Sequence, residues 1–112
     1  MKKWAVDLLY AMEEEINKVV KSVYQSDPSV TGVMVVDESG LCLENNNVPE
    51  EAAGLFASVA ARSEMALLLG ANQNTESSPV VQIEADSMVI IIKRVYGYTM
   101  GIVKDKTKAS GT

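Results

Sequence analysis

The most informative segment of the sequence is PVVQIEADSMVIIIK, residues 79–93. Two runs of β-branched and other apolar side chains flank Asp86 and Ser87, and this order predicts a hairpin with strands at residues 80–84 and 88–93. The first strand contains no lysine and no internal proline, which are the residues that commonly protect an exposed strand edge. We therefore expect a partner strand to cover this edge, because an open edge of this kind invites aggregation.

The segments on either side of this hairpin predict two helices and three more strands. Residues 6–24 place apolar side chains at spacings of three and four, as an amphipathic helix does. Residues 30–36 are β-branched or apolar almost throughout, which is typical of a central strand buried on both faces. A turn leads to a short strand at residues 41–43, a second helix is expected over residues 52–69, and a last strand over residues 98–103. The order helix, two strands, helix, three strands indicates an α/β fold.

The length of 112 residues leaves room for one domain, which we place at residues 1–104, followed by a flexible basic tail at residues 105–112. Ten Lys and Arg residues against fifteen Asp and Glu residues argue against electrostatic capture of nucleic acid or of an anionic membrane. A single cysteine excludes an intrachain disulfide and favours a reducing compartment. Because we find no signal peptide, apolar span or lipidation motif, we expect any membrane attachment to come from a partner.

Candidate catalytic chemistry is sparse in this sequence. Histidine, the commonest general base and transition-metal ligand, is absent, and no phosphate-binding glycine motif occurs. Cys42 could act as a nucleophile, but it alternates with Leu41 and Leu43, which we expect to face the core, so a buried structural thiol is favoured. Asp37 could be a placed carboxylate, although a turn-forming role is favoured. The sequence thus predicts no enzyme, no cofactor and no metal site.

The second helix carries a wide apolar arc. At about 100° per residue, the small and apolar side chains of residues 52–69 span roughly 200°, whereas one contact face needs about 100°. We therefore expect this helix to contact its own sheet on one side and a partner on the other. Leu55, Val59 and Ala66 lie within roughly 40° of one another on the helical wheel, so they are predicted to meet a partner helix.

Three stretches of this sequence resemble the roadblock/LC7 family, and in particular its Ragulator branch. They are PSVTGVMVVDESGLCL at residues 28–43, EEAAGL at residues 50–55 and PVVQIE at residues 79–84. The likeness extends over residues 8–104. The resemblance implies a roadblock-type antiparallel sheet of five strands with two helices and without a third helix at the C-terminus.

The resemblance also implies a dimer, in which the second helices of two chains pack together and the third strands pair edge to edge. The implied partner interface consists of Ala52, Leu55, Phe56, Val59, Arg62, Ser63, Ala66, Val80, Val81, Gln82 and Ile83. The helix residues would meet the partner helix, and the strand residues would meet the partner strand.

By this resemblance, the chain is a non-catalytic scaffold subunit with three kinds of partner. They are another roadblock-fold subunit, a wrapping lipidated scaffold subunit, and Rag-type small GTPases. The expected place is the cytosolic face of late endosomes or lysosomes, in nutrient signalling through the TOR kinase. The alternative is a self-pairing roadblock protein that regulates a small GTPase or serves as a dynein-type light chain.

Overall fold

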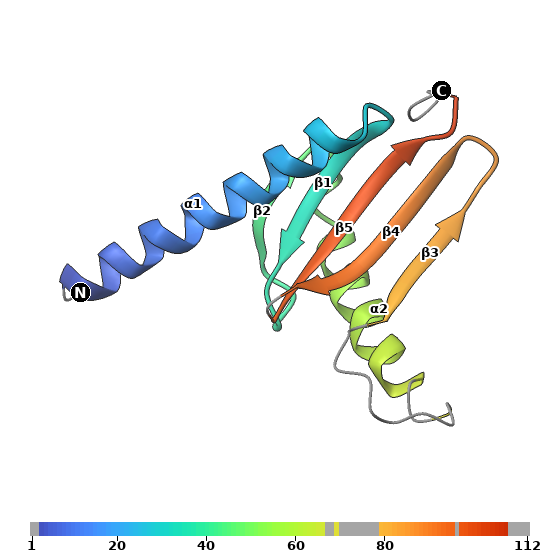
Figure 1. Ribbon diagram of the computed structural model, residues 1–112. Helices are drawn as coiled ribbons and strands as arrows, with labels where there is room; N and C mark the ends of the chain where they lie inside the picture. Colours follow the sequence, from blue (N-terminus) through green and yellow to red (C-terminus); the bar gives the residue numbers. More distant parts are fainter. Residues whose placement is uncertain (1–2, 67–68, 70–78, 96, 108–112) are drawn as a thin grey trace.

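The computed structural model describes residues 3–66, 69, 79–95 and 97–107, without the side chains of residues 4–12. This part of the chain forms two α-helices and a five-stranded sheet (Figure 1). The elements in chain order are α1 (Lys3–Ser26), β1 (Val30–Val36), β2 (Cys42–Asn46), α2 (Ala52–Ala66), β3 (Val80–Glu84), β4 (Met88–Val95) and β5 (Tyr98–Asp105). The predicted order of elements is confirmed, and β1 and β3 begin and end at the predicted residues.

The sheet is antiparallel throughout and has the strand order β2-β1-β5-β4-β3. β1 lies between β2 and β5, and it is buried on both faces of the sheet, as its apolar sequence predicts. β2 and β3 form the two edges, so each has one side without a neighbour among the described strands. The β3–β4 hairpin turns at Asp86 and Ser87 as expected, and the Ala85 N–H donates to the Met88 carbonyl at 2.9 Å.

The two helices cover opposite faces of the sheet, because side chains alternate along β1 and supply a core on each side. The core on the α2 side consists of Met34, Val36, Val48, Ala53, Phe56, Ala60 and Ile92. The core on the α1 side consists of Val20, Val30, Val33, Val35 and Met100. The N-terminal half of α1 extends beyond the sheet (Figure 1). No helix in the described part of the chain combines the length and apolar character needed to cross a membrane.

A glycine in β5 makes room for the aromatic ring of α2. A Cβ atom at Gly101 would lie 2.5 Å from Cδ2 and 2.9 Å from Cζ of Phe56. Phe56 is only 2% exposed, so its ring lies against the bare backbone of β5. This contact holds α2 close to the centre of the sheet and determines which face of the helix points outward.

The expected packing of the second strand is wrong. The strand begins at Cys42, and Leu41 and Leu43 are exposed instead of facing the core, with 62% of Leu41 accessible. A register shift in the β1–β2 pair places Cys42 opposite Val36, whose side chain lies in the core on the α2 side. Cys42 is therefore the residue that packs against this core, and it is half-buried.

The last strand extends further than predicted. It ends at Asp105, so the expected boundary between the domain and its tail falls inside β5. The Asp105 N–H donates to the Ser29 carbonyl at 2.9 Å, and the Lys106 N–H donates to the Ser87 carbonyl at 3.0 Å. These bonds tie the end of β5 to the segment before β1 and to the β3–β4 turn. Residues 108–112, the rest of the expected tail, lie outside the described residues.

Candidate partner interface

The outer edge of β3 presents backbone groups that none of the described strands bonds. In an antiparallel pair, residues that exchange hydrogen bonds alternate with residues whose N–H and C=O groups point away from the neighbouring strand. The bond from Ala85 to Met88 makes these two a bonded pair, so the pairs formed by Glu84, Gln82 and Val80 with β4 are of the non-bonded kind. The N–H and C=O groups of these three residues therefore point outward, where a further strand would bond them.

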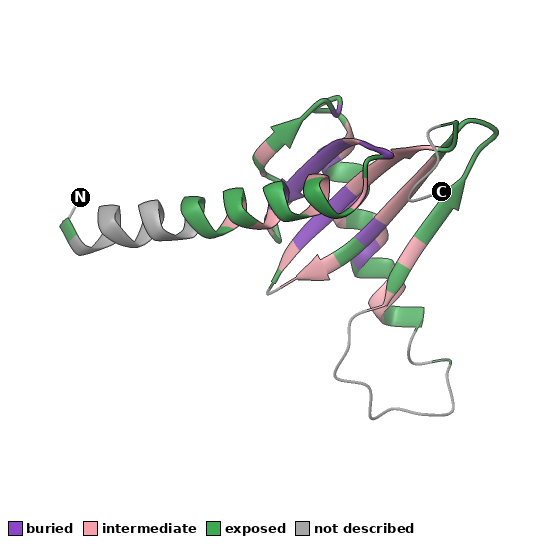
Figure 2. Cartoon of the chain, turned by 45° about the horizontal axis from the view of Figure 1, so that its top comes forward, coloured by how far each residue is buried: buried purple, intermediate pink, exposed green. Residues whose placement is uncertain are grey.

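The side chains of β3 divide between the two faces of the sheet. Val81 packs against the core on the α2 side, and Ile83, on the same face, is 43% exposed. On the α1 side Val80 is 56% exposed, and Gln82 and Glu84 are also exposed. Figure 2 shows exposed residues along β3 and buried residues in the middle of the sheet. The predicted strand residues of the interface thus lie at an open edge.

The outer surface of α2 is a second exposed region. Leu55 is 56% exposed and Met65 is 67% exposed, although both are large apolar side chains. Arg62 lies between them along the helix, and its Nε donates to the Ser58 hydroxyl at 3.4 Å. An exposed apolar stripe on a helix is typical of a surface that contacts another protein.

The residues predicted for the helix interface fall into three groups. Leu55, Arg62 and Ala66 are exposed. Ala52, Val59 and Ser63 are half-buried. Phe56 lies in the core against β5, so it does not belong to the exposed surface. Ala66 is the last residue of α2, and Gly70, the predicted stop of the helix, lies outside the described residues.

Other residues on the outer surface of α2 are absent from the predicted interface. They are Gly54, Ser58, Ala61 and Met65, all of which are exposed. Because small and apolar residues occur around most of this helix, the sequence pattern did not indicate which side of the helix faced the sheet. The sequence signal that could have identified these four residues is Phe56, the only aromatic residue of α2. If Phe56 faces the sheet, all four lie within roughly 40° of the side of the helix that faces away from the sheet.

α2 and the β3–β4 hairpin are held together as one surface. Nη1 of Arg94, in β4, lies 3.1 Å from Oε1 of Glu64, in α2. Val59 of α2 and Val81 of β3 pack against the same core cluster. The outer surface of α2 and the open edge of β3 therefore have a defined position relative to each other.

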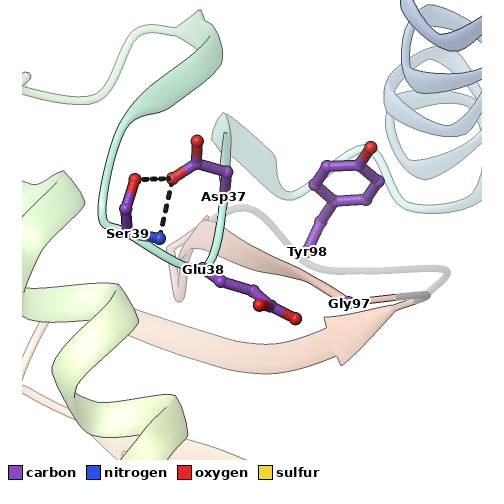
Figure 3. Close-up of a pocket in the computed structure, with 5 residues that line it drawn as sticks. All are labelled: Asp37, Glu38, Ser39, Gly97 and Tyr98. Atoms are coloured by element: carbon purple, nitrogen blue, oxygen red, sulfur yellow. Dashed lines mark hydrogen bonds between the residues drawn. The ribbon is translucent and has the colours of Figure 1, made fainter.

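Asp37 organises the turn between β1 and β2. Its Oδ1 accepts hydrogen bonds from the Ser39 hydroxyl at 2.8 Å, the Ser39 N–H at 2.9 Å and the Leu41 N–H at 2.9 Å. These bonds, with that of the Ser39 hydroxyl as the largest cause, lower the pKa of Asp37. An open hollow beside the turn is lined by Asp37, Glu38, Ser39, Gly97 and Tyr98, and Figure 3 shows the Asp37 carboxylate bonded to Ser39 across the turn. The predicted turn-forming role of Asp37 is confirmed.

Cys42 has the surroundings of a structural thiol. Burial raises its pKa, and the charges of Glu50 and Glu44 raise it further. Its Sγ donates to the Glu44 carbonyl at 3.5 Å. A raised pKa keeps the thiol protonated at neutral pH, and the protonated thiol is a poor nucleophile. Within the described part of the chain, no three His, Cys, Asp or Glu side chains are placed to hold a metal ion.

Solved structures of low sequence identity share this fold. The Roadblock/LC7 domain from Streptomyces avermitilis has a TM-score of 0.64 and 14% identity, over 77% of this chain and 74% of that chain. Myxococcus xanthus MglB has a TM-score of 0.67 and 19% identity, over 87% of this chain and 74% of that chain. A structure described as MglB with tetrameric arrangement has a TM-score of 0.67 and 16% identity, over 85% of this chain and 74% of that chain. No curated protein matches the sequence.

The family follows from the sequence itself. The family model described as Ragulator complex protein LAMTOR5 matches residues 12–104. The matched region runs from the first helix to the last strand and contains both α2 and the β3 edge. The chain therefore belongs to the LAMTOR5 family of Ragulator complex proteins and has the roadblock/LC7 fold.

Proposed function

We propose that this chain is a non-catalytic scaffold subunit that pairs with another roadblock-fold protein in a Ragulator-like complex. The pair docks Rag-type small GTPases for nutrient signalling through the TOR kinase at the lysosome. The observation that carries the proposal is the open edge of β3, with the outward backbone groups of Val80, Gln82 and Glu84, next to an exposed apolar face of α2. Membership of the Ragulator family supports the complex in which this surface acts.

A partner with the same architecture suits both parts of this surface. Its edge strand would bond the outward groups of β3, which is the mode of recognition known as strand addition. Its helix would cover Leu55 and Met65, and full burial of such side chains contributes roughly 1.5–3 kcal/mol each. Because association itself costs several kcal/mol, the strand and the helix are both needed for a stable pair.

The proposed membrane attachment is indirect. The chain has a net charge of −5, so its overall charge opposes binding to an anionic surface. In the proposed complex, a wrapping scaffold subunit carries the lipid anchor. It brings this chain to the cytosolic face of late endosomes or lysosomes.

Replacing Leu55 with glutamate tests the proposed assembly. The change puts a charge on the outer surface of α2, where a bound partner would desolvate it, so we expect at least a tenfold loss of pairing. Leu41→Glu is the matched control, because Leu41 is also an exposed leucine but lies at the opposite edge of the sheet.

The assay is a pull-down of the tagged full-length chain from cells, quantified by mass spectrometry. Wild type and L41E should retain a second roadblock-fold protein, a lipidated scaffold subunit and Rag-type GTPases, and L55E should lose all three together. If L55E captured the same set at the same level, this surface would not be the partner interface.

The second candidate function is a self-pairing roadblock protein that regulates a small GTPase or serves as a dynein-type light chain. The likeness to MglB with tetrameric arrangement favours it, since a protein of this fold assembles in that structure. The same pull-down separates the two candidates. The self-pairing protein would bring down copies of itself and a GTPase or motor component, without a second roadblock subunit and a lipidated scaffold.

A further inference from the structure

One row of exposed residues along α2 carries a charge at each end. The row consists of Glu51, Leu55, Ser58 and Arg62, which are spaced by four, three and four residues and therefore lie above one another on the helix surface. Glu51 directly precedes α2, and the first two N–H groups of the helix donate to carbonyls three residues back, so the first helical turn includes Glu51. The row thus begins with an acid, ends with a base and is uncharged between them.

Neither charge of this row is neutralised within the described part of the chain. Arg62 donates from Nε to the Ser58 hydroxyl at 3.4 Å, and it forms no ion pair with a described residue. Glu51 forms no ion pair with a described residue either. The remaining acid of α2, Glu64, is paired with Arg94 of β4. A partner that covers the row therefore takes two unpaired charges out of water, which is costly unless it supplies their counter-charges.

The order of the charges limits which partner helix fits. Acidic side chains are favoured at the start of a helix and basic ones at its end, and the row of α2 has this order. A partner helix with the same order fits if it runs antiparallel, because its acid then lies against Arg62 and its base against Glu51. In a parallel arrangement, like charges would face each other at both ends. The two charges lie roughly 16 Å apart along the axis, so both contacts fit on one helix of about four turns.

We propose that Arg62 and Glu51 determine which roadblock-fold subunit this chain accepts. Arg62 bonds a carboxylate at the start of the partner's helix, and Glu51 pairs with a cation near the end of that helix. The inference rests on the proposed function, since it uses the same surface of α2, and it adds the charge chemistry of the partner. A guanidinium suits a carboxylate because it can donate two parallel hydrogen bonds. A subunit whose helix lacks this acid is rejected, because it would bury Arg62 unpaired.

Replacing Arg62 with methionine tests the proposal, because the sign of the effect depends on what faces the guanidinium. Methionine keeps an unbranched apolar side chain and removes the charge. With a carboxylate opposite, R62M should reduce the captured roadblock-fold subunit about tenfold or more, since it leaves that carboxylate buried and unpaired. With no carboxylate opposite, R62M should increase the capture, since it removes an unpaired buried charge. Arg62→Lys should lie between wild type and R62M, because lysine keeps the charge but not the two parallel bonds.

The assay is the quantified pull-down of the tagged full-length chain from cells. Glu51→Gln should also reduce the capture. Lys21→Met is the matched control, because it removes an exposed cation of α1, on the opposite face of the sheet, and it should capture as much as wild type. Mass spectrometry identifies the captured subunit, whose sequence should have Asp or Glu in the first turn of the helix that follows its second strand. Circular dichroism of each purified variant checks that it folds.

Two results would overturn the proposal. They are a capture by R62M that equals or exceeds that of wild type, and a captured subunit without an acid at the start of that helix. Both leave the proposed function standing as long as L55E loses its partners, because L55E tests the surface and R62M tests its charge. If L55E kept its partners, or if wild type captured no roadblock-fold subunit, the proposed function would fail together with the charge contacts.

Discussion

Replacing Gly101 with alanine tests how α2 is seated on the sheet. The new Cβ would lie 2.5 Å from Cδ2 and 2.9 Å from Cζ of Phe56, whereas carbon atoms pack best at about 3.5–4.0 Å. Phe56 is 2% exposed and lies between the helix and β5, so its ring has no free space into which to move. Overpacking of a core costs about 1–3 kcal/mol, and the rigid ring favours the upper part of that range. We therefore expect G101A to lower the free energy of unfolding by about 2–3 kcal/mol.

Urea unfolding followed by circular dichroism, at one protein concentration, measures this loss. Gly54→Ala is the matched control, because no atom beyond the adjacent residues and the nearby backbone of α2 lies within 4 Å of the added Cβ, and alanine should stabilise the helix by up to about 1 kcal/mol. Phe56→Leu, with its smaller side chain, should recover part of the stability of G101A, so the double variant should lose less than the sum of the single losses. If G101A were as stable as wild type, or if the two changes were additive, the ring would not pack against β5 as described.

Three further predictions concern single side chains. Nζ of Lys104 lies 2.7 Å from Oδ2 of Asp27, and its hydrogen bond is the largest cause that lowers the pKa of Asp27 from 3.8 to about 2. The ion pair therefore stabilises the fold fully above about pH 4, and this stabilisation is lost as the pH falls towards 2. Asp27→Asn should flatten the dependence of the melting temperature on pH between these two values. Cys42 should react more slowly with iodoacetamide at neutral pH in the folded chain than in the urea-unfolded chain, and equal rates would refute the structural thiol. Gln82→Pro removes an N–H that points away from β4, so it should weaken pairing with a partner, as measured by sedimentation, while the chain stays folded. Val81→Pro removes an N–H that bonds β4, so it should lower the melting temperature.

The sequence predicted best the strands that have either a continuous apolar run or clear boundary residues. β1 is β-branched or apolar almost throughout and contributes to both cores, and β3 is bounded by a proline and a turn. The packing of β2 was harder to predict, because an edge strand buries few side chains. In addition, the register shift in the β1–β2 pair makes Cys42 face the core in place of Leu41 and Leu43. The end of β5 also depends on contacts that are distant in sequence, such as the bond from Asp105 to Ser29.

The candidate interface was predicted in part for a related reason. An edge strand without protecting residues can be recognised from its own composition, and β3 is such a strand. The outward face of α2 cannot be read from its composition, because small and apolar residues occur around most of the helix. The fit of Phe56 against Gly101 orients the helix, and this contact joins residues that are far apart in the sequence. In the folded chain, Ser58, Ala61 and Met65 lie on the exposed side of α2.

Amide hydrogen exchange along β3 tests the central claim most directly, because it reports separately on the two sides of one strand. The comparison is between L55E, expected to be monomeric, and the assembled wild-type chain. In the monomer, the outward amides of Val80, Gln82 and Glu84 should exchange quickly, and those of Val81 and Ile83, which bond β4, should be protected. In the assembly, all five should be protected. If the outward amides exchanged equally fast in both states, β3 would not be the edge that a partner covers.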